Sequence, residues 1–118
     1  MKYLVNPIDA PLEPTISFDT EYTEKNVRRA SLLSMSIGVS PELTYIFDTD
    51  HIMHAKRLLD YVGRIYTWNG VVDWYMMLKN SIVVSPTLIW DAMLMEHLVD
   101  ERLDHGLGDF AIRECNDN

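Results

Sequence analysis

Residues 16–21 read Ile16-Ser17-Phe18-Asp19-Thr20-Glu21, a short apolar run that ends in two acidic residues. Successive side chains of a β-strand alternate between its two faces, so Asp19 and Glu21 are expected on one side, roughly 6 to 7 Å apart. Neighbouring carboxylates repel each other, and a divalent metal ion with oxygen ligands relieves that repulsion. The alternative is a solvent-exposed strand end that is simply acidic. The hexapeptide alone leaves both interpretations open.

The composition is that of one small folded domain. The chain has 118 residues, of which 47% are hydrophobic, enough for a core and too many for a disordered chain. Its net charge of -8 argues against non-specific polyanion binding but not against a metal-dependent phosphodiester site. A single cysteine excludes an internal disulfide. No apolar run reaches the ~18 residues of a membrane span and no signal-peptide pattern is present, so we expect a cytoplasmic protein without membrane contact.

The hydrophobic patterns predict an α/β fold with a mixed sheet and helices against its faces. Residues 1–15 form an extended lead-in, with at most an edge strand at 3–5. Three strands follow, the last two as an antiparallel hairpin, and all three share one sheet. The expected elements after the lead-in are strands 16–20, 30–39 and 43–47, helix 51–61, strand 64–68 parallel to the first strand or to the strand before the crossover, helix 71–79, a short apolar segment at 82–84 or 87–90, helix 91–101, and helical turns from 107.

Two of these helices have a recognisable cap and apolar side. Asp48, Thr49 or Asp50 is expected to cap the first helix. Its apolar side consists of Ile52, Leu58, Leu59 and Val62. Asp91 is expected to cap the last long helix, and spacing predicts a core stripe there. The members of that stripe are Met93, Leu94, Leu98 and Val99.

A second polar pair follows the strand at residues 64–68. Asn69 and Asp73 are four positions apart, so both can address the same point from one helix face. The helix dipole would stabilise Asp73 as an anion. A capping Asn with an ordinary surface Asp is the alternative. If this strand neighbours the first one, Asp73 comes close to Asp19 and Glu21, and three carboxylates form a metal site without His or Cys.

These segments occur in an order that resembles a known family. They are Phe18-Asp19-Thr20-Glu21, Leu32-Leu33-Ser34-Met35-Ser36-Ile37-Gly38, Ile46-Phe47-Asp48, Trp68-Asn69-Gly70-Val71-Val72-Asp73, Asp91-Ala92-Met93-Leu94 and His105-Gly106-Leu107. Over about residues 16–111 the chain resembles the 3′–5′ proofreading exonuclease domain of bacterial and phage family A DNA polymerases. That domain is DnaQ-like and has the ribonuclease H-like fold. The resemblance implies a single exonuclease-like domain over residues 1–118.

The resemblance also implies roles for individual residues. Asp19, Glu21 and Asp73 match the family's catalytic acids, which bind two divalent ions, Mg²⁺ or Mn²⁺. Thr20, Tyr22 and Asn69 match positions near the terminal nucleotide, although Tyr22 replaces the commoner Thr. The implied reaction is two-metal phosphodiester hydrolysis at the 3′ end of single-stranded DNA. The implied partner is a polymerase domain or another replication protein, and an RNA exonuclease of the same group has the same motifs.

One element of the family pattern is missing. The family takes a fourth carboxylate from Tyr-x-x-x-Asp or His-x-x-x-Asp on a later helix. His105 and Asp109 have that spacing, but their segment aligns with the stretch that precedes this helix. We therefore expect a C-terminally incomplete fold, weak metal binding and little or no activity. The alternative function is a catalytically incomplete nuclease-like protein that binds a protein or a nucleic-acid end. Its candidate contact residues, unless they fill the core, are Trp68, Trp74, Tyr75, Met76 and Met77.

Overall fold

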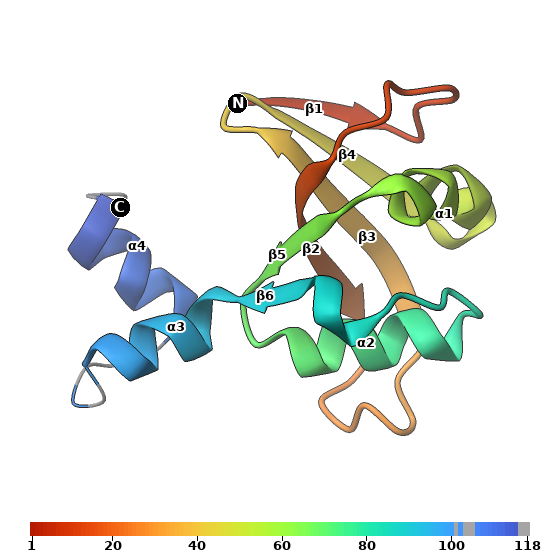
Figure 1. Ribbon diagram of the computed structural model, residues 1–118. Helices are drawn as coiled ribbons and strands as arrows, with labels where there is room; N and C mark the ends of the chain where they lie inside the picture. The colour runs from red at the N-terminus through yellow and green to blue at the C-terminus, as the bar shows by residue number, and fades with distance from the viewer. Residues whose placement is uncertain (101, 103–105, 116–118) are drawn as a thin grey trace.

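The computed structural model describes residues 1–100, 102 and 106–115. Six strands form one sheet in the order β1-β4-β3-β2-β5-β6 (Figure 1). The central strands β2, β3 and β4 are antiparallel, whereas β1, β5 and β6 run parallel to their neighbours. The strands are β1 (Lys2–Val5), β2 (Thr15–Tyr22), β3 (Leu32–Ser40), β4 (Leu43–Asp48), β5 (Arg64–Thr67) and β6 (Ile89–Asp91).

The helices alternate with the later strands. They are α1 (Ile52–Tyr61), α2 (Gly70–Lys79), α3 (Ala92–Val99) and α4 (Leu107–Cys115), with 3-10 turns at Thr49–His51 and Pro86–Leu88. The predicted antiparallel hairpin is confirmed. Of the two strands offered as the parallel neighbour of β5, the structure has the first one, β2. Of the two positions offered for the apolar segment, β6 matches 87–90. The lead-in forms the edge strand β1, which pairs with β4.

The core lies on the face of the sheet that α1 and α2 cover. In β2, buried and exposed side chains alternate, with Ile16 and Phe18 turned into the core. The predicted apolar side of α1 is confirmed, since Leu58, Leu59 and Val62 are buried and Ile52 packs against them. From α2, Met76 and Met77 are fully buried. These two methionines therefore belong to the core, the second of the possibilities that the sequence left open for them.

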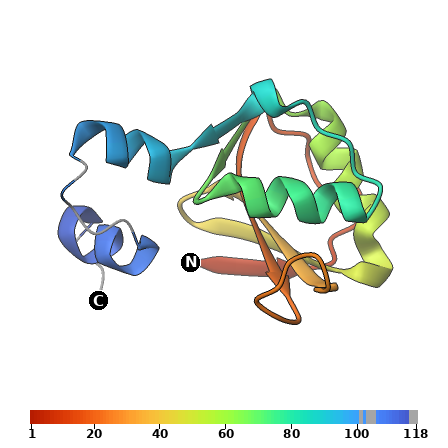
Figure 2. The same cartoon turned by 90° about the horizontal axis from the view of Figure 1, so that it is seen from below.

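The predicted core stripe of α3 is wrong. Leu98 and Val99 are 85% and 84% exposed, and Leu94 is also exposed. The reason is that α3 continues beyond the edge strand β6, so no sheet lies beneath it (Figure 2). Glu96 is the buried residue of this helix, and it pairs with Arg113 of α4. Glu101, the expected end of this helix, lies outside the described residues.

The start of α1 also differs from expectation. A 3-10 turn precedes the helix, and neither Asp48 nor His51, at the two N-cap positions, makes a side-chain capping bond. Asp48 instead accepts hydrogen bonds from Asn6 Nδ2 at 2.9 Å and pairs with His51 Nδ1 at 2.6 Å. Its carboxylate thus ties the end of β1 to the start of the helix.

Candidate active site

Asp73 and Thr20 form the central contact of the site. Asp73 lies in the first turn of α2, and its side chain reaches β2. Its Oδ1 accepts hydrogen bonds from the Thr20 backbone nitrogen at 3.1 Å and from Thr20 Oγ1 at 2.6 Å. Asp73 is 4% exposed. Because neighbours in a strand face opposite sides, Thr20 meets α2 while Asp19 and Glu21 lie on the exposed side.

Burial raises the pKa of Asp73 from its usual 3.8 to about 7. The hydrogen bonds from Thr20 lower this pKa, and the negative charges of Asp19 and Asp91 raise it. The effect of Asp19 means that two carboxylates share one neighbourhood. A cation between them would favour the ionised form of Asp73.

A small cavity of about 100 Å³ joins most of the predicted site residues. Its lining consists of Asp19, Thr20, Tyr22, Trp68, Asn69, Val72 and Asp73. Glu21 is exposed on the same face of β2 as Asp19, outside this lining. The sheet therefore brings five of the six predicted residues to one place, and Glu21 stands beside it.

Asp91 holds the turn that carries Asn69. Asn69 is in the left-handed conformation, with φ 59° and ψ 55°. Its backbone nitrogen donates to Asp91 Oδ1 at 3.0 Å, and that of Gly70 donates to Oδ2 at 2.9 Å. Asp91 also accepts from Met93 N at 3.0 Å, which confirms the predicted cap of α3. The Asp91 carboxylate thus caps α3, as predicted, and it also caps the start of α2, which the sequence analysis did not predict.

Gly70 allows α2 to begin close against the sheet. A Cβ at this position would lie 2.2 Å from Thr67 Oγ1 and 3.2 Å from a methyl group of Ile89. Any larger residue would push the first turn of α2 away from β5. Asp73, three residues later, would move with it.

The donor set fits a divalent cation in part. Asp19 and Asp73 offer the hard oxygen ligands that Mg²⁺ and Mn²⁺ prefer. Within residues 1–100, 102 and 106–115, however, no three His, Cys, Asp or Glu side chains are grouped so that they could hold one ion. His105, from the His-x-x-x-Asp pattern, lies outside the described residues. The described carboxylates therefore suit one cation better than two.

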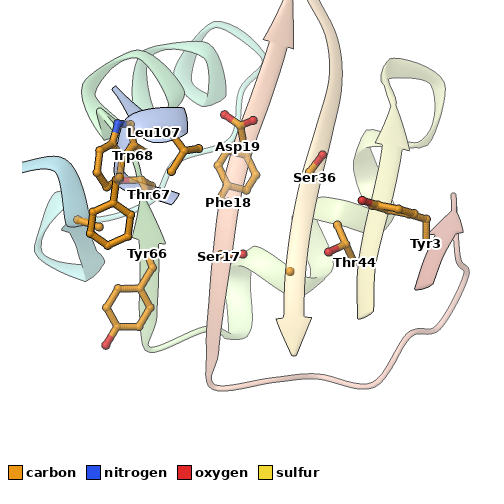
Figure 3. A pocket seen from close by; sticks show the side chains of 13 residues that line it. Tyr3, Ser17, Phe18, Asp19, Ser36, Thr44, Tyr66, Thr67, Trp68 and Leu107 are labelled. Carbon is orange, nitrogen blue, oxygen red and sulfur yellow. The ribbon is translucent and has the colours of Figure 1, made fainter. Parts of the chain in front are cut away.

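A second cavity, of about 490 Å³, opens beside Asp19 on the uncovered face of the sheet (Figure 3). The sequence analysis did not predict this cavity. Its signal in the sequence is a row of small residues at alternate positions of β3, namely Ser34, Ser36 and Gly38, which indicates a shallow open face. Its lining consists of Tyr3, Ser17, Phe18, Asp19, Ser36, Gly38, Thr44, Tyr66, Thr67, Trp68, Ala92, Leu107 and Phe110. Trp68 and Asp19 line both cavities, so the two are adjacent.

No protein-family model matches the sequence, and neither does any curated protein. Solved structures do match. NrnC of Brucella melitensis, in a structure with bound Mg²⁺, superposes with a TM-score of 0.81 at 16% identity over 100% of this chain. Escherichia coli RNase D, an exoribonuclease involved in structured RNA processing, gives 0.75 at 14% identity over 99%. The EXO domain of Aedes aegypti Nibbler gives 0.59 at 18% identity over 78%.

The chain spans 64% of the NrnC chain, 34% of RNase D and 49% of the Nibbler domain. At such low identity the likeness establishes the fold of this chain. The ribonuclease H-like mixed sheet expected from the sequence is thereby confirmed. No helix of the described residues is both long enough and apolar enough to cross a membrane.

Proposed function

We propose that this chain is a DEDD-type 3′–5′ exonuclease module that hydrolyses phosphodiester bonds at single-stranded 3′ ends. The main support for the proposal is that Asp19 and Asp73 line the same cavity in a fold that solved nucleases share. Neither residue is near the other in sequence, and the buried one is held by two hydrogen bonds in an orientation toward β2. A salt bridge would require a basic partner, whereas Asp73 accepts its hydrogen bonds from Thr20.

Each predicted residue has a place in this function. Asp19 and Asp73 would hold a divalent cation, with Glu21 beside them on the exposed face of β2. A bound cation would supply positive charge at the scissile phosphate. Thr20 holds the Asp73 carboxylate in position, and Tyr22 and Asn69 line the same cavity where a terminal nucleotide would lie.

RNA is the favoured substrate within this class. One NrnC structure holds pGG, and RNase D is described as an exoribonuclease. The DNA proofreading role expected from the sequence has no counterpart among these neighbours, so neither a polymerase partner nor a replication role is retained. The net charge of -8 agrees with a short substrate, because a long polyanion would be repelled along its length.

The sequence-based expectation of weak activity remains a prediction. Two carboxylates line the cavity, and a third, Glu21, stands outside it. With fewer acids the site would bind its cation less tightly than a full set of ligands would. We therefore expect slow release of mononucleotides, faster with Mn²⁺ or Mg²⁺ than without either.

The test is hydrolysis of 5′-labelled RNA and DNA heptamers with Mn²⁺ or Mg²⁺, for the wild type and for Asp19→Asn and Asp73→Asn. Asp50→Asn is the matched control, since Asp50 is an exposed acid outside both cavities. We expect products shortened from the 3′ end that disappear in the two site variants and persist in the control. Hydrolysis that persists in Asp19→Asn would rule the proposal out.

The second candidate is binding without cleavage, the alternative that the sequence raised. The exposed Leu98 and Val99 of α3 favour it, because adjacent exposed apolar side chains are typical of interaction surfaces. The same assay separates the two functions. Heptamer binding without metal-dependent products, unchanged by Asp19→Asn, would favour this candidate.

A further inference from the structure

The sheet has two edges, and β1 is the more open of them. At the other edge, β6 is three residues long and continues directly into α3. β1 lies beside β4 at the opposite edge (Figure 1), and all four of its side chains are exposed. Tyr3 is 59% exposed and Val5 69%. An exposed edge strand with apolar side chains is a template on which another strand can pair.

The backbone of β1 bonds to the sheet through every second residue. The backbone nitrogens of Lys2 and Asn6 donate to carbonyl oxygens of β4 and of the residue before it, at 2.6 and 2.7 Å. Alternate residues of a strand bond to the same neighbour, so Leu4, midway between them, also faces β4. The amide and carbonyl groups of Tyr3 and Val5 therefore point to the outer edge, where a further strand would lie.

A second copy of β1, running antiparallel, fits these outward groups about a two-fold axis at Leu4. Tyr3 then lies opposite the partner copy's Val5, and each of the two such pairs exchanges two hydrogen bonds. The two Leu4 residues form the non-hydrogen-bonded pair between them, with Cα atoms about 4.5 Å apart. An axis at Tyr3 would leave the groups of Val5 without a partner inside β1. The axis at Leu4 is thus the register in which β1 satisfies itself.

The charges along this edge also suit an antiparallel second copy. Lys2, at the start of β1, is exposed, and it belongs to none of the ion pairs among the described residues. The other end of β1 is acidic. Asp48 bonds to Asn6 there at 2.9 Å, and Asp9 follows in the next turn, both exposed. A lysine in an edge strand discourages pairing when its charge has no partner. In the antiparallel pair, each Lys2 comes to the acidic end of the other copy.

The second copy would also add to the larger cavity. Tyr3 forms the end of that cavity across the sheet from Trp68 (Figure 3). Tyr3 and Val5 lie on the same face of β1, because they are two residues apart. The partner copy's Val5 would therefore lie beside Tyr3 on the open face, at a Cβ separation of about 5 Å. An apolar residue from the second copy thereby extends the end of the cavity.

We propose that two copies of this chain associate through their β1 strands, which pair antiparallel about a two-fold axis at Leu4 and join the two sheets into one. The inference goes beyond the proposed function, and a failed hydrolysis assay would not affect it. The small interface implies a reversible dimer, since four residues of strand bury far less area than a permanent interface does.

A cross-linking experiment tests the register. Cys115 is the only cysteine, so Cys115→Ser provides a background without thiols. In that background, Leu4→Cys places two cysteines at the axis with Cα atoms about 4.5 Å apart, within disulfide range. Tyr3→Cys is the matched control, because its two copies lie about 8 Å apart, beyond that range. With oxidised glutathione we expect a covalent dimer from Leu4→Cys and none from Tyr3→Cys on a non-reducing gel.

The association itself is measured by analytical ultracentrifugation between about 10 µM and 1 mM protein. Val5→Pro removes an outward N–H from each copy and leaves the bonds to β4 in place, so it should weaken the dimer at least about 10-fold. Val5→Ala keeps that N–H and should weaken it less. In the wild type, hydrogen exchange at the Tyr3 and Val5 amides should slow as the protein concentration rises, whereas exchange at Leu4 should not depend on it.

Three results would overturn the inference. The first is a wild-type protein that stays monomeric at about 1 mM. The second is association that Val5→Pro leaves unchanged, because the contact would then lie on another surface, such as the exposed side of α3. The third is a covalent dimer from Tyr3→Cys but not from Leu4→Cys, because the strands would then pair in another register.

Discussion

Thr20 donates two hydrogen bonds to one oxygen of Asp73, across 53 positions of sequence. Thr20 is the residue between Asp19 and Glu21, so the strand that presents two carboxylates on one face holds a third from its other face. The position of the Asp73 carboxylate thus depends on Thr20, although an Asp-x-Glu motif leaves the identity of this middle residue open.

Replacing Thr20 with Val removes the hydroxyl donor and keeps the backbone donor and the side-chain shape. Because the hydroxyl hydrogen bond lowers the pKa of Asp73, this pKa should rise above its present value of about 7. The variant should then need a higher pH than the wild type for Mn²⁺ to raise its melting temperature. Thr20→Ser, which keeps the hydroxyl, is the control. Coinciding pH profiles for Thr20→Val and the wild type would contradict the prediction.

Asp73 should make the protein less stable as the pH rises. Its pKa is about 7 in the folded state against 3.8 in the unfolded chain, so the folded state binds the proton more tightly. Protonated Asp73 therefore contributes its full stabilisation of the folded state below pH about 4, and this contribution is lost as the pH rises through about 7. Asp73→Asn keeps an oxygen acceptor for Thr20 and has no charge to lose.

The free energy of unfolding of Asp73→Asn, relative to the wild type, should therefore increase between pH 4 and pH 8 by on the order of 2 to 4 kcal/mol. Urea denaturation at a series of pH values, with a chelator present, measures it. A difference between the two proteins that stays constant over this range would contradict the prediction, because it would show that folding does not raise the pKa of Asp73.

Asp91→Ala should destabilise the protein by about 1 to 2 kcal/mol, because one side chain caps α3 and bonds the amides of Asn69 and Gly70. The control is Asp60→Ala, since Asp60 makes a surface pair with Lys56 at 2.7 Å and such a pair contributes about 0.5 kcal/mol or less. Urea unfolding compares the two. Equal losses would mean that the Asp91 hydrogen bonds contribute no more than a surface ion pair.

Lys79→Met should loosen the connection between β2 and β3. Lys79 is the last residue of α2. Its ammonium group donates hydrogen bonds to the carbonyl oxygen of Val27 at 3.0 Å and to that of Ala30. Without it these carbonyls lose a charged donor, and we expect about 1 to 3 kcal/mol of destabilisation. Faster hydrogen exchange in residues 27–31 would accompany it. Lys25→Met, an exposed lysine in the same connection, is the control and should change neither quantity.

The sequence alone determined most of the sheet and one side of its core. The apolar run at residues 16–20 predicted a strand with Asp19 and Glu21 on one face, and β2 confirms both. The hairpin and the apolar side of α1 follow equally local patterns. Such patterns suffice where one element meets one surface, because the period of the element sets which side chains face inward.

Only the tertiary structure decided where α3 lies and how the site is assembled. The pattern of Leu94, Leu98 and Val99 is that of a buried face, yet α3 runs past the edge of the sheet and leaves them exposed. Likewise, Asp19 and Asp73 share a cavity because β5 pairs beside β2 and Asp91 holds the turn before α2. Periodicity states which side of an element is apolar, whereas the pairing of distant strands determines what that side meets.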